Sequence, residues 1–142
     1  MSGEMKKKLP PPVLLSAVVC DQVIIDARTN KASVIGIFEN ISAPKYPARH
    51  PRLAFFFELT NGRGKIELTI KLVDVHNEDK MLWECTVQQE LKDVRQVVNS
   101  TFDISGIQFP HPGEYRFQIY AGTDLLGERR IICTEVKLRE DE

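Results

Sequence analysis

Eight consecutive residues, 65–72, alternate between polar and apolar side chains without a break, in the order KIELTIKL. Because successive side chains of a β-strand point to opposite faces, the pattern places four apolar residues against a core and four polar residues in water. An α-helix would scatter the same apolar residues around its circumference. The segment therefore predicts a β-sheet with one buried face and one wet face.

Weaker copies of this alternation recur along most of the chain. Further strands are expected at residues 14–25, 33–41, 53–60, 81–91, 98–104, 115–119 and 125–136, separated by turn-forming clusters such as NGRG at 61–64. A helix over residues 87–94 is a competing interpretation, because that segment is rich in helix-forming side chains. The expected fold class is all-β: a two-layer antiparallel β-sandwich, immunoglobulin-like, with about seven to eight strands. A closed barrel is the alternative.

Length and composition indicate one folded domain with charged ends. Of the 142 residues, 42% are hydrophobic and 27% are charged, which is typical of a globular domain. We expect a disordered leader over residues 1–12, a single sandwich domain over 13–136 and an acidic tail over 137–142. The 19 basic and 20 acidic side chains nearly cancel. No strong field is therefore expected to attract nucleic acid or an anionic membrane.

Apolar segments and cysteines favour a cytoplasmic location. Three prolines, Pro10 to Pro12, interrupt the one stretch that resembles a secretion signal, and no segment approaches the roughly 18–20 apolar residues of a membrane span. The cysteines are three in number and widely spaced, at Cys20, Cys85 and Cys133. A secreted sandwich usually pairs its cysteines, so these are expected to be buried and reduced.

Catalytic and metal-binding patterns do not stand out in the sequence. There is no Gly-x-Ser-x-Gly motif, and His50, His76 and His111 lie in proline-rich or polar turns, where solvated side chains are expected. No histidines or cysteines are at zinc-ligand spacing, and acidic residues around Asp74 are better explained as turn caps than as calcium ligands. We therefore predict a protein without enzymatic activity, catalytic residues, metal or cofactor.

Residues 43–52 contain three prolines, which predict an irregular loop rather than a central strand. Prolines restrict the unfolded chain, so this loop is able to present side chains in a fixed arrangement. Tyrosine and arginine often carry the binding energy of interfaces. The candidate interaction residues are Tyr46, Arg49, His50 and Arg52. The alternative is a loop that only crosses between the sheets.

The first two expected strands lack a wet face, because apolar residues occupy both sides of each. These residues are Val18, Val19, Val23, Ile24 and Ile25, followed by Val34, Ile35, Ile37 and Phe38. Such a surface needs a cover, either from the ends of the chain or from another subunit. The leading hypothesis is a non-catalytic interaction module that uses either the proline loop or these strands, with a protein partner or a homodimer as the contact through the strands. A small-ligand site for a sugar or lipid is the alternative, and a hydrolytic enzyme comes third.

Two stretches of the domain carry a resemblance. The first comprises CDQVIID at 20–26, Thr29-x-Lys31-x-Ser33 and GIF at 36–38, and the second comprises PGEYRF at 112–117 with GER at 127–129. The first resembles the opening signature, and the second is similar to the end, of a family of small bacterial proteins known only as a domain of unknown function. The resemblance covers roughly residues 14–136 and implies an uncharacterised bacterial β-sandwich. It implies no activity, ligand or catalytic residue.

Overall fold

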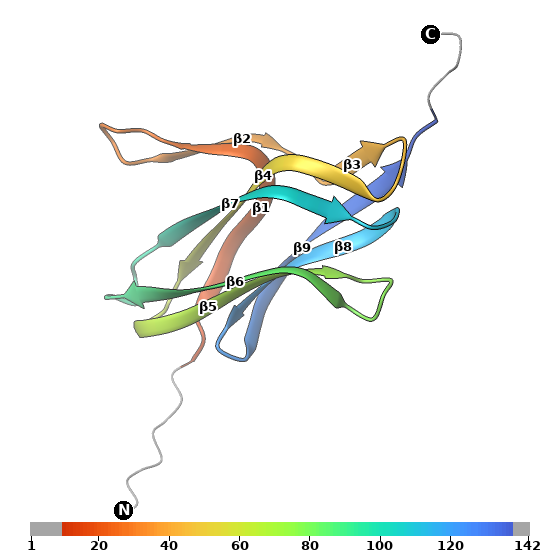
Figure 1. Ribbon diagram of the computed structural model, residues 1–142. Coiled ribbons are helices and arrows are strands. Elements are labelled where there is room, and N and C mark those ends of the chain that lie inside the picture. Colours follow the sequence, from red (N-terminus) through yellow and green to blue (C-terminus); the bar gives the residue numbers. More distant parts are fainter. Residues whose placement is uncertain (1–9, 138–142) are drawn as a thin grey trace, which may run out of the picture.

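Nine strands form two facing sheets in the computed structural model, which describes residues 10–137 (Figure 1). The strands are β1 (Val13–Ile25), β2 (Ala32–Ile37), β3 (Asn40–Ala43), β4 (Ala48–Thr60), β5 (Gly64–Asp74), β6 (Lys80–Leu91), β7 (Val98–Phe109), β8 (Gly113–Ala121) and β9 (Asp124–Glu135). One sheet has the order β2-β1-β4-β7 and the other the order β3-β9-β8-β5-β6. All neighbours are antiparallel except β3 and β9. The predicted all-β sandwich is confirmed.

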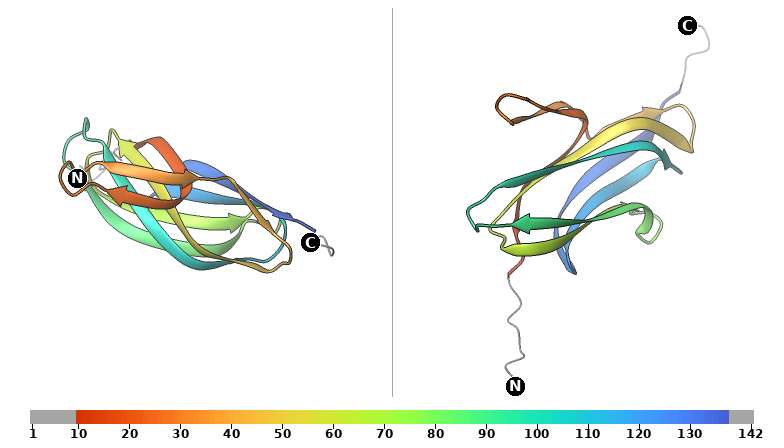
Figure 2. Two further views of the ribbon diagram at one scale, coloured as in Figure 1. Left: turned by 90° about the horizontal axis from the view of Figure 1, so that it is seen from above. Right: turned by 60° about the vertical axis from the view of Figure 1, so that its left-hand side comes forward.

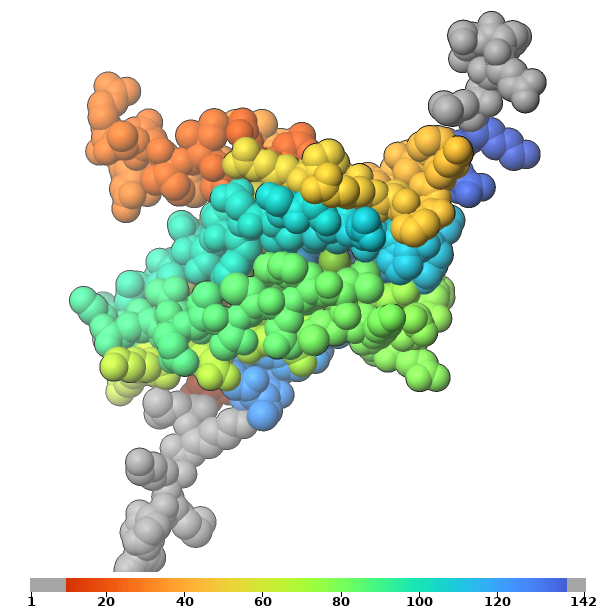
Figure 3. Space-filling model, viewed as in Figure 1, coloured from red at the N-terminus to blue at the C-terminus, as the bar shows by residue number. Residues whose placement is uncertain are grey.

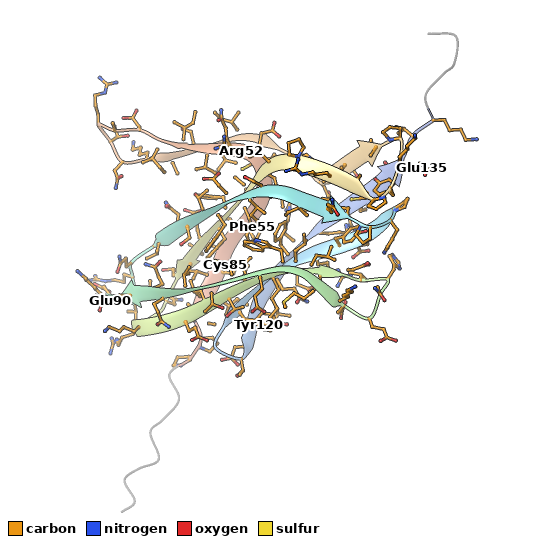
Figure 4. All side chains as sticks on the ribbon, in the orientation of Figure 1. Arg52, Phe55, Cys85, Glu90, Tyr120 and Glu135 are labelled. Carbon is orange, nitrogen blue, oxygen red and sulfur yellow. The ribbon has the colours of Figure 1, made fainter. Side chains whose placement is uncertain are left out.

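The alternating segment over residues 65–72 lies within β5. Leu68, Ile70 and Leu72 are fully buried, whereas Lys65 and Glu67 are exposed. From the facing sheet, Phe55 lies between the layers and stacks on Phe117 of β8, with ring centroids 4.7 Å apart (Figure 4). The inner faces of the two sheets therefore meet in one apolar core.

The single strand expected over residues 33–41 is wrong, because the chain changes sheets within it. Strand β2 belongs to the four-stranded sheet, while β3 pairs in parallel with β9 in the other sheet. Two adjacent residues mark the crossing. The Phe38 N–H donates to the Val19 carbonyl at 2.9 Å, whereas the Glu39 carbonyl accepts from the Ile132 N–H at 2.8 Å. An apolar run can satisfy either sheet, so periodicity alone does not reveal the switch.

The irregular loop expected over residues 43–52 is also largely wrong, because β4 begins at Ala48 and passes through Pro51. Pairing between β1 and β4 reaches only to Cys20 opposite Ala54, so the first residues of β4 pair with β7 alone. A proline is tolerated there because this part of the strand is an edge. The competing helix over residues 87–94 is not formed either, since β6 runs to Leu91.

Strand β1 extends beyond its pairing with β4. Residues 22–25 pair only with β2, and together they form a two-stranded hairpin that leaves the body of the sandwich. We call residues 21–37 the β1–β2 arm. In Figure 1 and in the right-hand view of Figure 2 it projects from one corner of the molecule, and in Figure 3 its outer end stands apart from the body.

The ends of the chain are only partly described. Residues 1–9 of the expected leader and 138–142 of the expected acidic tail lie outside the described residues. Pro10 to Pro12 precede β1 without strand structure. Within residues 10–137, no helix is long and apolar enough to cross a membrane.

Candidate functional site: the β1–β2 arm and the pocket at its root

Large apolar side chains gather on the β1–β2 arm and remain in contact with water. The exposed fractions are 47% for Ile24, 50% for Ile25, 41% for Ile35 and 57% for Ile37. Ile35 lies opposite Gln22, and Ile37 opposite Cys20. Because opposite residues of an antiparallel pair share a face, Ile24, Ile35 and Ile37 lie on the outer face of the four-stranded sheet. The uncovered apolar surface of the arm is thus built mainly from one face.

The same outer face is covered nearer the middle of the sheet. Cys20 and Ala54 are fully buried and Phe56 is 7% exposed, although all three side chains point away from the core. Burial raises the pKa of the Cys20 thiol, which lies 3.6 Å from the Ala54 carbonyl oxygen. The chain therefore covers this face of the sheet around Cys20. Beyond Cys20, β1 no longer pairs with β4, and the isoleucines of the arm are exposed.

A pocket of about 360 Å³ lies at the root of the arm, between β2, β3 and the start of β4. Its lining includes Asp21 and Gly36 of the arm, Phe38 of the crossing segment and His50 of β4. The rings of Phe38 and His50 are 5.5 Å apart and tilted by 40°. The pocket thus brings the residues of the opening signature together with one of the candidate interaction residues.

Gly36 is required at this root for two reasons. Its φ is +72°, a conformation that residues with a Cβ rarely adopt, and an added Cβ would lie 2.3 Å from an Asp21 carboxylate oxygen. Gly36→Ala should therefore lower the free energy of unfolding by about 1–2 kcal/mol, measured by urea denaturation. Gly122→Ala is the matched control, because Gly122 has a φ of +59° but nothing within 4 Å of an added Cβ.

The control separates backbone strain from the contact with Asp21. Gly122→Ala should show the smaller loss, and the double variant Asp21→Ala/Gly36→Ala should recover most of the difference from that control, since only the Cβ of residue 21, 3.1 Å from the added Cβ, still approaches. Equal losses in Gly36→Ala and Gly122→Ala would show that the close approach of Asp21 contributes nothing.

The four candidate interaction residues do not form one patch. The Tyr46 hydroxyl donates to the Thr134 carbonyl at 2.7 Å, and the half-buried ring packs against the core. Burial raises the pKa of Tyr46. The other three side chains have different neighbours. The Arg49 guanidinium lies over Gly106, and His50 lines the pocket. Arg52, labelled in Figure 4, approaches Asp103 at 3.8 Å. Of the four, only His50 reaches the root of the arm.

A polar cluster that the sequence analysis missed lies at the end of β5. Asp74 is fully buried, and its Oδ2 lies 2.6 Å from His111 Nε2. His111 Nδ1 lies 2.6 Å from the Pro112 carbonyl oxygen. Both ring nitrogens thus face oxygen atoms, an arrangement in which the doubly protonated, cationic ring donates two hydrogen bonds. The Pro112 carbonyl and the Asp74 carboxylate accordingly raise the pKa of His111.

The expectation of a solvated His111 is therefore wrong, and the sequence did contain the signal. The inward positions 68, 70 and 72 continue to 74, which places Asp74 on the buried face opposite Tyr115. A buried carboxylate needs a partner. The Tyr115 hydroxyl, whose pKa burial raises to about 12, donates to the His111 carbonyl at 2.5 Å and completes the cluster. We interpret it as a structural clamp between β5 and the β7–β8 turn.

The outer face of the five-stranded sheet offers a second, wider pocket of about 430 Å³, lined by charges of both signs. Arg116 lies 2.7 Å from Glu114 and 3.1 Å from Glu128, and Arg130 lies 2.8 Å from Glu39. These side chains neutralise one another in surface ion pairs. Arg129 also lines the pocket, and within the described residues its buried Nε has no hydrogen-bond partner. Among the described residues, no group of three or more His, Cys, Asp or Glu side chains is arranged to hold a metal ion.

The sequence of the domain matches one known protein family. The sequence pattern of DUF6941, described as a family of unknown function, matches residues 15–134. A search of the curated proteins found no match.

Solved structures resemble the fold only distantly. An immunoglobulin-like protein from Pseudomonas aeruginosa is 14% identical with a TM-score of 0.39, and the match covers 90% of this chain and 100% of that one. A β-glucosidase from Listeria innocua in complex with gluconolactone is 12% identical with a TM-score of 0.43 over 70% of this chain. The match spans 15% of the length of that glucosidase chain. In a second structure of the enzyme, in complex with isofagomine, identity is 9% and the TM-score is 0.42, and the match covers 89% of this chain and 17% of that one. At these values the likeness carries no inference about activity.

Proposed function

The chain belongs to DUF6941, a family of unknown function, and we propose that it is a non-catalytic protein-interaction module whose contact surface is the β1–β2 arm. The observation that carries the proposal is the set of four half-exposed isoleucines on a hairpin that projects from the sandwich. Exposed apolar residues are ordinary when scattered, but a contiguous group marks a contact site.

The wet face of the five-stranded sheet supplies the contrast within the same molecule. Arg116, Glu128 and Arg130 form ion pairs there, and Lys71 lies 4.9 Å from the centre of the Tyr120 ring. In the β1–β2 arm, by comparison, charged residues are confined to Asp21 and the turn over residues 26–31. Depletion of charge with retention of large apolar side chains is the compositional mark of an interface core.

The free energy available from burying the isoleucines indicates what kind of contact the arm makes. Full burial of an isoleucine side chain contributes roughly 1.5–3 kcal/mol, so covering four half-exposed ones contributes about 4 kcal/mol. Association itself costs roughly 4–15 kcal/mol in lost freedom of motion. Apolar contact alone therefore leaves little net affinity, and a stable complex also needs the backbone hydrogen bonds that the outer edge of β2 offers. Strand addition to a sheet edge supplies both.

The test is capture of partners from a native lysate on immobilised protein. The double variant Ile24→Ser/Ile37→Ser should lose a protein that the natural sequence retains in stoichiometric amount. Leu125→Ser/Val97→Ser is the matched control, since both residues are about as exposed but lie outside the arm, and it should retain that protein. Equal retention by all three proteins would contradict the proposal.

A small-ligand site is the second candidate, because the pocket at the root combines the Phe38 ring with the polar groups of Asp21 and His50. Apolar surface with a few convergent polar groups is the usual composition of a ligand pocket. A saturable increase in unfolding temperature with one class of sugar or lipid, lost in His50→Ala, would favour this candidate. We place the protein in the cytoplasm, where free Cys20, Cys85 and Cys133 suit the reducing conditions.

A further inference from the structure

The pocket at the root of the β1–β2 arm gathers polar side chains that have no bonding role within the fold. Asp21, Asn40 and His50 line it from β1, β3 and β4. Within residues 10–137, none of these three side chains has a hydrogen-bond partner. The fourth polar side chain of the lining, Ser42, shares its hydroxyl with that of Thr134 at 3.1 Å. Strands of both sheets therefore bring three hydrogen-bonding groups to one pocket, where a ligand can use them.

An aromatic ring and a carboxylate lie close to the backbone in the same pocket. The Phe38 ring packs partly against the core and lies 5.5 Å from the ring of His50. The Asp21 carboxylate lies over Gly36, where the position of a Cβ would be only 2.3 Å from Oδ2. Glycine at residue 36 thus leaves the space that this carboxylate occupies.

We propose that the pocket binds a sugar. The Phe38 ring packs against the apolar C–H face of the sugar ring, and Asp21, Asn40 and His50 hydrogen-bond to its hydroxyl groups. The proposal rests on the small-ligand candidate described above and names its ligand class. The volume of about 360 Å³ lies within the range of roughly 300–1,000 Å³ that is usual for small-molecule sites.

The hydrogen-bonding groups of the lining match those of a sugar. Each sugar hydroxyl both donates and accepts a hydrogen bond. The Asp21 carboxylate only accepts, whereas the Asn40 amide and a neutral His50 ring each offer a donor and an acceptor. Because hydrogen bonds to an ionised group are the stronger ones, Asp21 should contribute most of the polar affinity.

The composition of the lining disfavours anions and acyl chains. It contains no lysine or arginine, and the Asp21 carboxylate repels a phosphate or carboxylate group. Four of the eight lining residues have polar side chains, and an acyl chain would cover them without replacing the hydrogen bonds that water gives them. A sugar covers the Phe38 ring and satisfies the polar groups at the same time.

Titration with neutral sugars, followed by saturation-transfer NMR, tests the proposal. The probes are glucose, galactose, mannose and N-acetylglucosamine. At least one should bind saturably, with the strongest transfer to the C–H protons on one face of its ring. Asp21→Asn should weaken this binding about 10-fold, because asparagine has the same size but no charge.

Asp26→Asn is the matched control for the loss of charge. Asp26 lies in the turn of the same arm but outside the lining of the pocket. Its carboxylate accepts from the Arg28 backbone N–H at 2.8 Å, which the oxygen of an asparagine amide also does. The sugar affinity of Asp26→Asn should therefore equal that of the natural protein.

Phe38→Leu separates the ring contact from the polar contacts. Leucine keeps apolar bulk but lacks a flat ring, so the affinity for the sugar should fall about 5-fold. The fluorescence spectrum of Trp83, the single tryptophan, should stay unchanged and so show that the variant is folded. Equal sugar affinity in the natural protein, Asp21→Asn and Phe38→Leu would overturn the assignment of the sugar to this pocket.

A lipid probe distinguishes failure of the sugar from failure of the small-ligand candidate. Saturable binding of decanoate that is lost in His50→Ala, with no binding of the four sugars, would retain a small-ligand site and reject a sugar. Absence of binding by every probe would reject both. Capture of a lysate protein by the arm is measured separately and does not depend on these results.

Discussion

His111→Ala should lower the free energy of unfolding by about 2–3 kcal/mol near pH 6, measured by urea denaturation. The variant leaves the Asp74 carboxylate buried without its cation, and removal of one partner from a buried ion pair is strongly destabilising. The His111 side chain is 37% exposed, so the effect falls below that of a fully buried pair. His76→Ala is the control, because His76 is exposed in the turn after β5 and bonds to Asp74 only through its backbone N–H.

The loss should depend on pH in a definite direction. Hydrogen bonds to the Pro112 carbonyl and to Asp74 raise the pKa of His111 above its ordinary value of 6.5. A raised pKa means that the folded state binds the proton more tightly. The contribution of His111 is therefore complete below about pH 6.5 and is lost as pH rises through the folded-state pKa. The difference between the natural protein and His111→Ala should shrink from pH 6 to pH 9. A constant difference would contradict a cationic ring.

Phe117→Ala should be the most destabilising single change considered, at about 4 kcal/mol. The ring is fully buried, stacks on Phe55 at 4.7 Å and meets the edge of Trp83 at 6.4 Å. Removal of the ring leaves a cavity between the two sheets and also loses the free energy gained by burying its apolar surface. Trp83 is the single tryptophan of the chain, so its fluorescence reports both the unfolding transition and the altered core.

Tyr120→Ala is the matched control for this core substitution. Tyr120 lies on the same strand but on the outer face, half-buried beside Lys71 (Figure 4). Its loss should be about 1 kcal/mol or less, because only a surface cation–π contact and partial burial disappear. A loss comparable to that of Phe117→Ala would mean that the outer face carries as much stability as the core.

Local pattern predicted those parts of the fold where one face meets the core and the other meets water. The strand over residues 65–72 is the clearest case, because its burial follows its polarity residue by residue. The same pattern, carried on to Asp74, would have located the buried carboxylate. Its partner was beyond reach, since His111 is 37 residues away and is brought to Asp74 by the pairing of β5 with β8.

The candidate site was likewise predictable only in part. Apolar residues on both sides of the first two strands indicated a surface in need of a cover, and the isoleucines of the β1–β2 arm are that surface. The prolines at residues 43–52 do not prevent a strand from Ala48 onward, because a proline removes one backbone hydrogen-bond donor and is compatible with an unpaired strand edge. Pro51 is accommodated where β1 does not pair with β4. The side chains expected to form one patch there are separated by strand pairing and by the anchoring of Tyr46 on β9.

The sequence by itself determined that this protein is an all-β sandwich whose first two strands carry apolar residues on both sides. Side-chain alternation is a local property, and burial of one face follows from it directly. Only the tertiary structure decided where this apolar segment divides between the two sheets and how far β1 extends beyond its pairing with β4. These two features decide which isoleucines remain exposed. These depend on the relative lengths and registers of strands distant in sequence, which hydrophobic periodicity does not encode.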